Sequence, residues 1–152
     1  MDGTTWDIPI ATFTITTGGV IGALTDVREF TREAIIPFSF DGGGSAIATG
    51  VKYSAQFKIP FDCHLIGWEI VADQSGSFVV DFWKDTYSNY PPTNADSVCG
   101  GDEPTLSGAI KNQNTNASGW AQSWSKGAIL LPNVDSVTTV EQVVVFLRVA
   151  IL

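Results

Sequence analysis

The chain ends in the apolar stretch VVVFLRVAIL, residues 143–152. Successive side chains of a β-strand point to opposite faces of its sheet. One face of this stretch would carry only aliphatic residues, namely Val143, Val145, Leu147, Val149 and Ile151. The other would carry Val144, Phe146, Ala150 and Leu152, interrupted by Arg148 alone. A strand with one face in water alternates apolar with polar residues, so this stretch predicts a strand that is buried on both faces.

Two arrangements would bury the second face of this strand. In the first, a neighbouring copy of the chain covers it, and the subunit interface contains Val144, Phe146, Arg148 and Ala150. In the second, the strand is central in its sheet and loops of its own chain cover it. Only 16% of the residues are charged, against about 25% in an average globular domain. A chain so poor in charge either has a surface rich in Ser, Thr, Asn and Gly or hides part of its surface in a subunit interface. We expect both, and therefore a homo-oligomer.

The rest of the chain also has the pattern of β-strands. Apolar residues alternate, β-branched and aromatic residues are frequent, and clusters of Gly, Asn, Asp and Pro separate the runs. The expected strands cover residues 8–15, 34–40, 51–59, 65–72, 78–83, 105–111, 128–131 and 137–151. Residues 73–76 would join two of them as a hairpin, since Gly76 suits a tight turn. The pattern predicts an all-β fold, an antiparallel β-sandwich or jelly roll.

The length of 152 residues fits one domain of ordinary size. Residues 1–32 differ from the rest because they are rich in Thr and Gly and cluster their charges near the end. We expect them to form a connecting arm that contains a short helical turn at 24–32, and residues 33–152 to form the sandwich.

Composition excludes several function classes. The net charge of −8 comes without any basic cluster, which argues against nucleic acid as a partner. The longest apolar run is too short to cross a bilayer, so we expect no membrane insertion. His64 is the only histidine, and it would point away from its neighbour Cys63, which leaves no nucleophile–base pair. We expect two buried thiols, Cys63 and Cys99, no metal, no cofactor and no enzymatic activity.

Aromatic residues in polar stretches are the best candidates for ligand binding. Aromatic rings beside amide and hydroxyl groups hold sugars by stacking and hydrogen bonds. The candidates are Tyr87, Tyr90, Trp120 and Trp124, within the segments 86–103 and 112–124. Because the two tryptophans share one face of an alternating run, the alternative interpretation is that both belong to the core.

Several motifs carry a family resemblance. Ile10-Ala11 and residues 24–28 resemble the segment that precedes the host-facing domain in many phage tail fibres. A longer set is similar to C-terminal domains of phage virion structural proteins, which include tail-fibre and receptor-binding domains. Its motifs are Ile36-Pro37-Phe38, DGGGSAI at 41–47, Ile59-Pro60-Phe61, Gly67-Trp68, ADQSGS at 72–77, VVDFWKD at 79–85, YPPT at 90–93, Pro104-Thr105-Leu106, Gly119-Trp120 and the closing stretch 137–152.

The resemblance implies a β-rich homotrimeric tip of a bacteriophage appendage, assembled in the bacterial cytoplasm and carried on the virion. Its partners would be other virion proteins and a glycan or protein on the host surface, and it would serve host attachment. Two other functions stay open. The chain would then be a head fibre, decoration or tail-assembly protein that binds only virion proteins, or a carbohydrate-binding module.

Overall fold

The computed structural model describes residues 12–15, 21–25 and 32–152. The chain divides into two compact units, Met1–Thr31 and Arg32–Leu152. In the first unit, strands β1 (Thr12–Ile15) and β2 (Ile21–Thr25) pair antiparallel. The helical turn predicted at 24–32 is wrong at Leu24 and Thr25, which belong to β2. Residues 26–31 of that turn and 8–11 of the first predicted strand lie outside the described residues.

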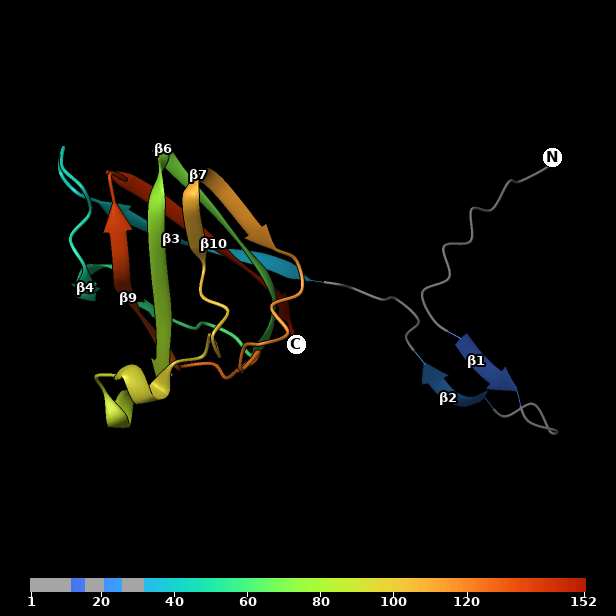
Figure 1. Cartoon of the computed structure of the whole chain (residues 1–152). Helices are drawn as coiled ribbons and strands as arrows, with labels where there is room; N and C mark the ends of the chain where they lie inside the picture. Colours follow the sequence, from blue (N-terminus) through green and yellow to red (C-terminus); the bar gives the residue numbers. More distant parts are fainter. Residues whose placement is uncertain (1–11, 16–20, 26–31) are drawn as a thin grey trace, which may run out of the picture. The chain divides into compact units, whose positions relative to one another are not determined.

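The second unit is built on one antiparallel sheet of eight strands (Figure 1). The strands are β3 (Glu33–Asp41), β4 (Gly50–Val51), β5 (Phe57–Lys58), β6 (Cys63–Asp85), β7 (Thr105–Asn114), β8 (Ser123–Trp124), β9 (Ile129–Thr138) and β10 (Gln142–Ile151). Short 3-10 turns, η1 (Tyr53–Ala55), η2 (Tyr87–Asn89) and η3 (Asn94–Asp96), lie in the loops. Residues 32–152 contain no α-helix, and the prediction of an antiparallel all-β fold is confirmed.

Strand β6 runs through both layers of the sheet. Residues 63–72 pair with β10, and residues 77–85 pair with β9. On its other edge, β6 pairs with β7 and β8. The sheet curls along β6, so that one layer contains β3, β10 and the first half of β6. The facing layer contains β4, β5, β9 and the second half of β6.

The hairpin predicted at residues 73–76 is wrong, because these residues are a bend within β6. The two halves of β6 form one continuous strand and do not pair with each other. The first half pairs with β10, and the second half pairs with β9. A Cβ atom on Gly76 would lie 2.5 Å from the Thr138 carbonyl oxygen. Glycine is needed at the bend because the two long strands approach so closely there.

Two other predicted strands are divided in the structure. The strand expected at 137–151 is the end of β9 and all of β10, separated at Thr139, whose φ of 63° lies in the left-handed region. The strand expected at 51–59 is β4 and β5 with η1 between them. Apolar residues keep a spacing of two from Val51 to Ile59, whereas Val137, Val140 and Val143 are three residues apart across the turn at Thr139.

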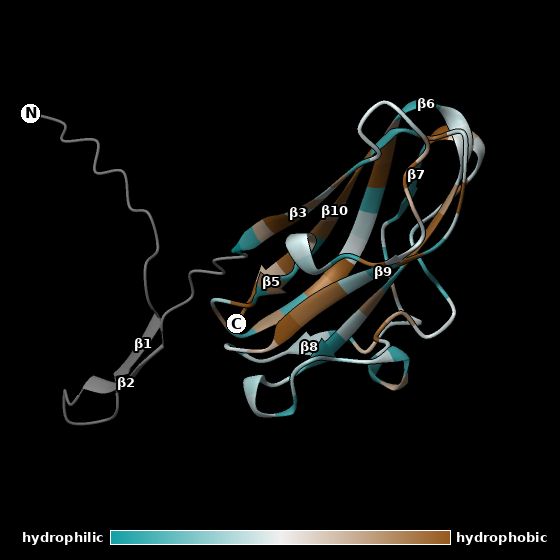
Figure 2. Ribbon diagram, turned by 90° about the vertical axis from the view of Figure 1, so that its left-hand side faces the viewer, coloured by the Kyte–Doolittle hydropathy of each residue, from teal (hydrophilic) through white to brown (hydrophobic). Residues whose placement is uncertain are grey.

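The core lies between the two layers. Phe38 of β3 meets Phe82 of β6 edge to face, with 4.8 Å between ring centroids, and Phe40 meets Phe78 at 5.6 Å. Figure 2 shows hydrophobic residues along β3 and β10. The largest fully buried side chains are Trp124, Phe38, Phe78, Phe82, Ile59, Leu65, Ile70, Leu106, Leu130, Leu131, Leu147 and Val80. Because β3 faces the second half of β6 across this core, the outer faces of the two layers point in opposite directions.

Candidate functional site

Strand β10 has one buried face and one partly exposed face. Val143, Val145, Leu147 and Val149 are at most 1% exposed. The four residues predicted for a subunit interface, Val144, Phe146, Arg148 and Ala150, lie on the other face and keep intermediate exposure in this structure. β10 is central in its layer, between β3 and β6, yet residues 32–152 leave its outer face partly open.

Neighbouring strands extend this apolar surface. Phe146 pairs with Pro37 of β3, and Val144 pairs with Val71 of β6. Ile35 lies beside Arg148 and is 62% exposed. We call Ile35, Pro37, Val71, Val144, Phe146 and Ala150 the Phe146 face. Within residues 32–152, one ion pair lies beside this face, between Arg148 and Glu33 at 3.5 Å.

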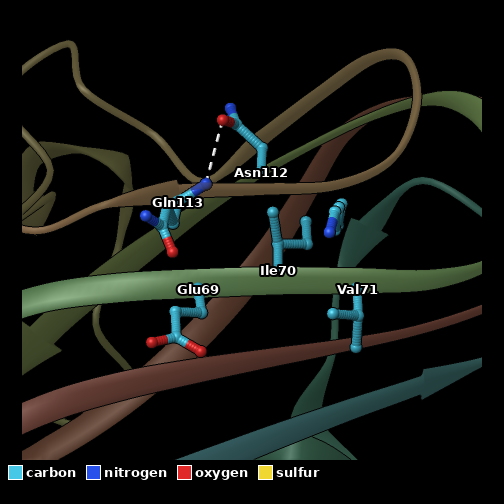
Figure 3. A pocket seen from close by; sticks show the side chains of 6 residues that line it. Glu69, Ile70, Val71, Asn112 and Gln113 are labelled. Carbon is cyan, nitrogen blue, oxygen red and sulfur yellow. Dashed lines mark hydrogen bonds between the residues drawn. The ribbon is translucent and has the colours of Figure 1, made fainter.

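The Phe146 face continues into a shallow hollow between β6 and β7. Glu69 and Val71 point out of the sheet on one side of β6, and Ile70 points to the other side (Figure 3). Lys111 and Gln113 of β7 pair with Val71 and Glu69. These side chains line a hollow of about 330 Å³ with the three β6 residues and Asn112. The surface therefore has an apolar centre on β3 and β10 and a polar border on β7.

A second pocket lies on the outer side of the opposite layer and contains two of the predicted binding residues. Tyr87 and Tyr90 line it together with Gln56, Lys58 and Ile129, around a volume of about 450 Å³. Tyr87 is 76% exposed and Tyr90 is 40% exposed. We call these five residues the Tyr87 pocket. It offers two aromatic rings, one amide and one ammonium group to a ligand.

The strands fix the polar side chains of this pocket. Lys58 lies on β5 opposite Ile129 of β9, and its Nζ is 5.7 Å from the centroid of the Tyr87 ring. The Tyr90 hydroxyl donates a hydrogen bond of 3.0 Å to Gln56 Oε1. Sequence reasoning missed Gln56, Lys58 and Ile129, because only the pairing of β5 with β9 brings them to the tyrosines. No local pattern around these three residues signals a site.

The structure places the other two predicted binding residues in the core. Trp120 is 5% exposed and Trp124 is 2% exposed. The indole N–H of Trp120 donates to the Asp102 carbonyl oxygen, and that of Trp124 donates to the Ala121 carbonyl oxygen. Their faces are packed against other side chains, so we leave both residues out of the candidate site.

Among the described residues, the buried Asp81 carboxylate is held by neighbours within the fold, whereas the buried Trp68 indole N–H has no hydrogen-bond partner. The Asp81 carboxylate accepts hydrogen bonds of 2.7 Å from the Trp83 indole and from the Ser97 hydroxyl. Burial raises the pKa of the Cys99 thiol and, with help from Asp62, that of the Cys63 thiol. Among the described residues, no three His, Cys, Asp or Glu side chains are placed to hold a metal ion together.

Comparisons with known proteins give no family for the chain. No protein-family model matches it, and no curated protein does. The described residues also include no helix long and apolar enough to span a membrane. The resemblance to phage appendage domains therefore stays a prediction.

Proposed function

We propose that the chain is a structural protein of a bacteriophage virion, a tail-fibre or receptor-binding tip domain that attaches the particle to its bacterial host. Copies of the domain associate through the Phe146 face, and the Tyr87 pocket binds a glycan of the cell surface. The observation that carries this proposal is the placement of an aromatic pocket and an apolar face on opposite outer sides of one sandwich.

The Tyr87 pocket has the chemistry of a saccharide site. The apolar faces of sugar rings stack on aromatic side chains, and their hydroxyl groups need hydrogen-bonding partners beside the ring. Tyr87 and Tyr90 supply the aromatic surface, and Gln56 supplies the amide. Since Tyr87 keeps three quarters of its surface in water, its ring adds little to the stability of the fold. A ligand can reach the exposed part of the ring, beside the Lys58 Nζ that lies over it.

The Phe146 face has the chemistry of a subunit interface. Monomeric proteins seldom leave a large contiguous apolar patch in water. Phe146 pairs with Pro37 of β3, and Val144 pairs with Val71 of β6, so apolar residues connect three adjacent strands, with Glu69 and Arg148 beside them on the same face. A second copy of the chain would cover it, and the resemblance to fibre tips makes three the expected number of copies.

The two surfaces suit an attachment role because contact between copies through the Phe146 face leaves the Tyr87 pocket exposed. When copies meet through the Phe146 face, each Tyr87 pocket lies on the layer that faces away from the contact. Several weak sites on one rigid assembly raise each other's effective concentration. Low affinity for a single sugar is then sufficient for adhesion.

Binding to intact bacteria tests this function. Fluorescently labelled chain is incubated with a panel of bacterial strains, alongside a Tyr87→Ala variant. A Tyr53→Ala variant is the matched control, because Tyr53 is also exposed but does not line the pocket. We expect the chain and the control to label at least one strain and the Tyr87→Ala variant to lose most of the signal. Failure to label any strain, or equal labelling by all three proteins, would contradict the proposal.

A second candidate function is that of a head-fibre, decoration or tail-assembly protein. The Phe146 face favours it, since another virion protein would cover that face as well as a second copy would. In that case purified virion proteins would capture the chain, a Phe146→Gln variant would escape capture, and bacterial cells would not bind it.

A further inference from the structure

We propose that the Tyr87 pocket selects saccharides that carry an anionic group, a carboxylate or a phosphate, and that Lys58 makes the selection. This inference rests on the proposed glycan binding and adds the class of ligand. It is carried by the position of the Lys58 ammonium and by the hydrogen-bonding groups that the pocket leaves free.

The Lys58 ammonium is available to a ligand. Its side chain is exposed, and within the described part of the chain no carboxylate forms a salt bridge with it. Its Nζ lies 5.7 Å from the centroid of the Tyr87 ring. A sugar ring that packs against Tyr87 therefore brings its substituents beside a positive charge.

The polar groups left free in the pocket are mainly donors. Gln56 Oε1 already accepts the Tyr90 hydroxyl proton, so the amide NH₂ is the part of Gln56 that remains for a ligand. The Lys58 ammonium has three donors and no acceptor. Carboxylates and phosphates offer only acceptors and form the stronger, charge-assisted hydrogen bonds with such donors. The pocket therefore matches an anionic sugar better than a neutral one.

The neighbouring carboxylate does not cancel this preference. Asp85 pairs with Ile129 from the other side, so one strand separates it from Lys58. Its Oδ1 accepts the Thr86 backbone N–H at 2.6 Å and the Asn89 amide at 3.2 Å. These bonds hold the carboxylate toward η2. The net charge of −8 acts over longer distances, and physiological salt screens exposed charges beyond about 8 Å.

Nuclear magnetic resonance titration of the labelled full chain tests the inference, with affinities taken from the amide signal of Tyr87. The first pair of probes is the α-1,4-linked trisaccharide of galacturonic acid and the neutral trisaccharide of galactose with the same linkage. The second pair is galactose 6-phosphate and galactose. Lys58→Gln is the test variant. Lys52→Gln is the control, because it removes the same charge from a residue that lines neither the Tyr87 pocket nor the hollow beside the Phe146 face.

We expect at least one anionic probe to bind about fivefold more tightly than its neutral partner, as an exposed charge contact of about 1 kcal/mol would give. Lys58→Gln should abolish this preference without weakening the binding of the neutral sugar, and Lys52→Gln should keep the preference. The pair that shows the preference identifies the carboxylate or the phosphate. Equal binding of anionic and neutral sugars, or a preference that survives Lys58→Gln, would overturn the role of Lys58 but leave the saccharide pocket standing. No response at Tyr87 to any probe would overturn both.

Discussion

Asp73 joins the bend of β6 to the start of β10. Its Oδ1 accepts the backbone N–H of Gln142 at 3.0 Å and that of Glu141 at 3.2 Å. The bend of β6 therefore lies beside the turn between β9 and β10, and the Asp73 carboxylate links the two. This bend gives the sandwich its two layers and separates the Phe146 face from the Tyr87 pocket.

The Asp73 contact should make stability depend on pH in the acid range. The hydrogen bonds from Gln142 and Glu141 lower the pKa of Asp73 below its ordinary value of 3.8. Such a group adds its full stability above the ordinary pKa and loses it as the pH falls through the lowered pKa. We expect Asp73→Asn to have a lower melting temperature than the native chain at pH 7. The difference should shrink progressively below about pH 4. A difference that is constant from pH 7 to pH 2 would contradict the contact.

Gly76 should tolerate no side chain. An added Cβ would lie 2.5 Å from both the Thr138 carbonyl oxygen and Val140 Cγ2, and the carbonyl belongs to the backbone and cannot rotate away. We expect Gly76→Ala to destabilise the chain by about 2–3 kcal/mol in urea unfolding. Ser75→Ala, one residue earlier at an exposed position, should cost less than about 1 kcal/mol. Similar costs for the two variants would show that the strands do not approach closely there.

The bend also explains which part of the fold was predictable from sequence. Alternation of apolar residues depends only on which side of a strand a side chain occupies, so it located most strands. The polar cluster at 73–76 looks like a hairpin turn, because Asp, Ser and Gly favour tight turns. Whether such a cluster reverses the chain or only bends it depends on its partners. Those partners, Thr138 to Gln142, are more than 60 residues away and cannot be read locally.

The aromatic contact across the core should show coupling between the two layers. Phe38 and Phe82 meet edge to face, and such pairs contribute about 0.5–1.5 kcal/mol beyond the area that they bury. We expect a double-mutant cycle of Phe38→Leu and Phe82→Leu to give a coupling energy in that range. The cycle of Phe40→Leu with Phe82→Leu should give a smaller value, since the Phe40 ring contacts Phe78 instead. Equal coupling energies in both cycles would argue against the packing of β3 on the second half of β6.

The two thiols should be unreactive in the folded chain. Cys63 and Cys99 are fully buried, and burial raises the pKa of each thiol. Because the thiolate is the reactive form, alkylation with iodoacetamide at pH 8 should be slow in buffer and fast in guanidinium chloride. Mass spectrometry would count the modified thiols over time. Rapid modification of either cysteine under native conditions would contradict its place in the core.

The candidate site was predictable only in part. Tyr87 and Tyr90 stood out because aromatic residues in a polar, proline-rich loop have no core to join. Trp120 and Trp124 carried the same signal, but the indole N–H groups find backbone carbonyl partners inside the fold. A single sequence does not distinguish a tryptophan that binds a ligand from one whose polar atom is satisfied in the core.

Self-association through the Phe146 face is the central claim, and the molar mass in dilute solution tests it most directly. Light scattering on the full chain at micromolar concentration should give three times the chain mass of 16.3 kDa. A Phe146→Gln variant should give a lower mass with an unchanged circular dichroism spectrum, and Tyr87→Ala should keep the native mass. A native chain that elutes as a stable single copy of 16.3 kDa would contradict the account.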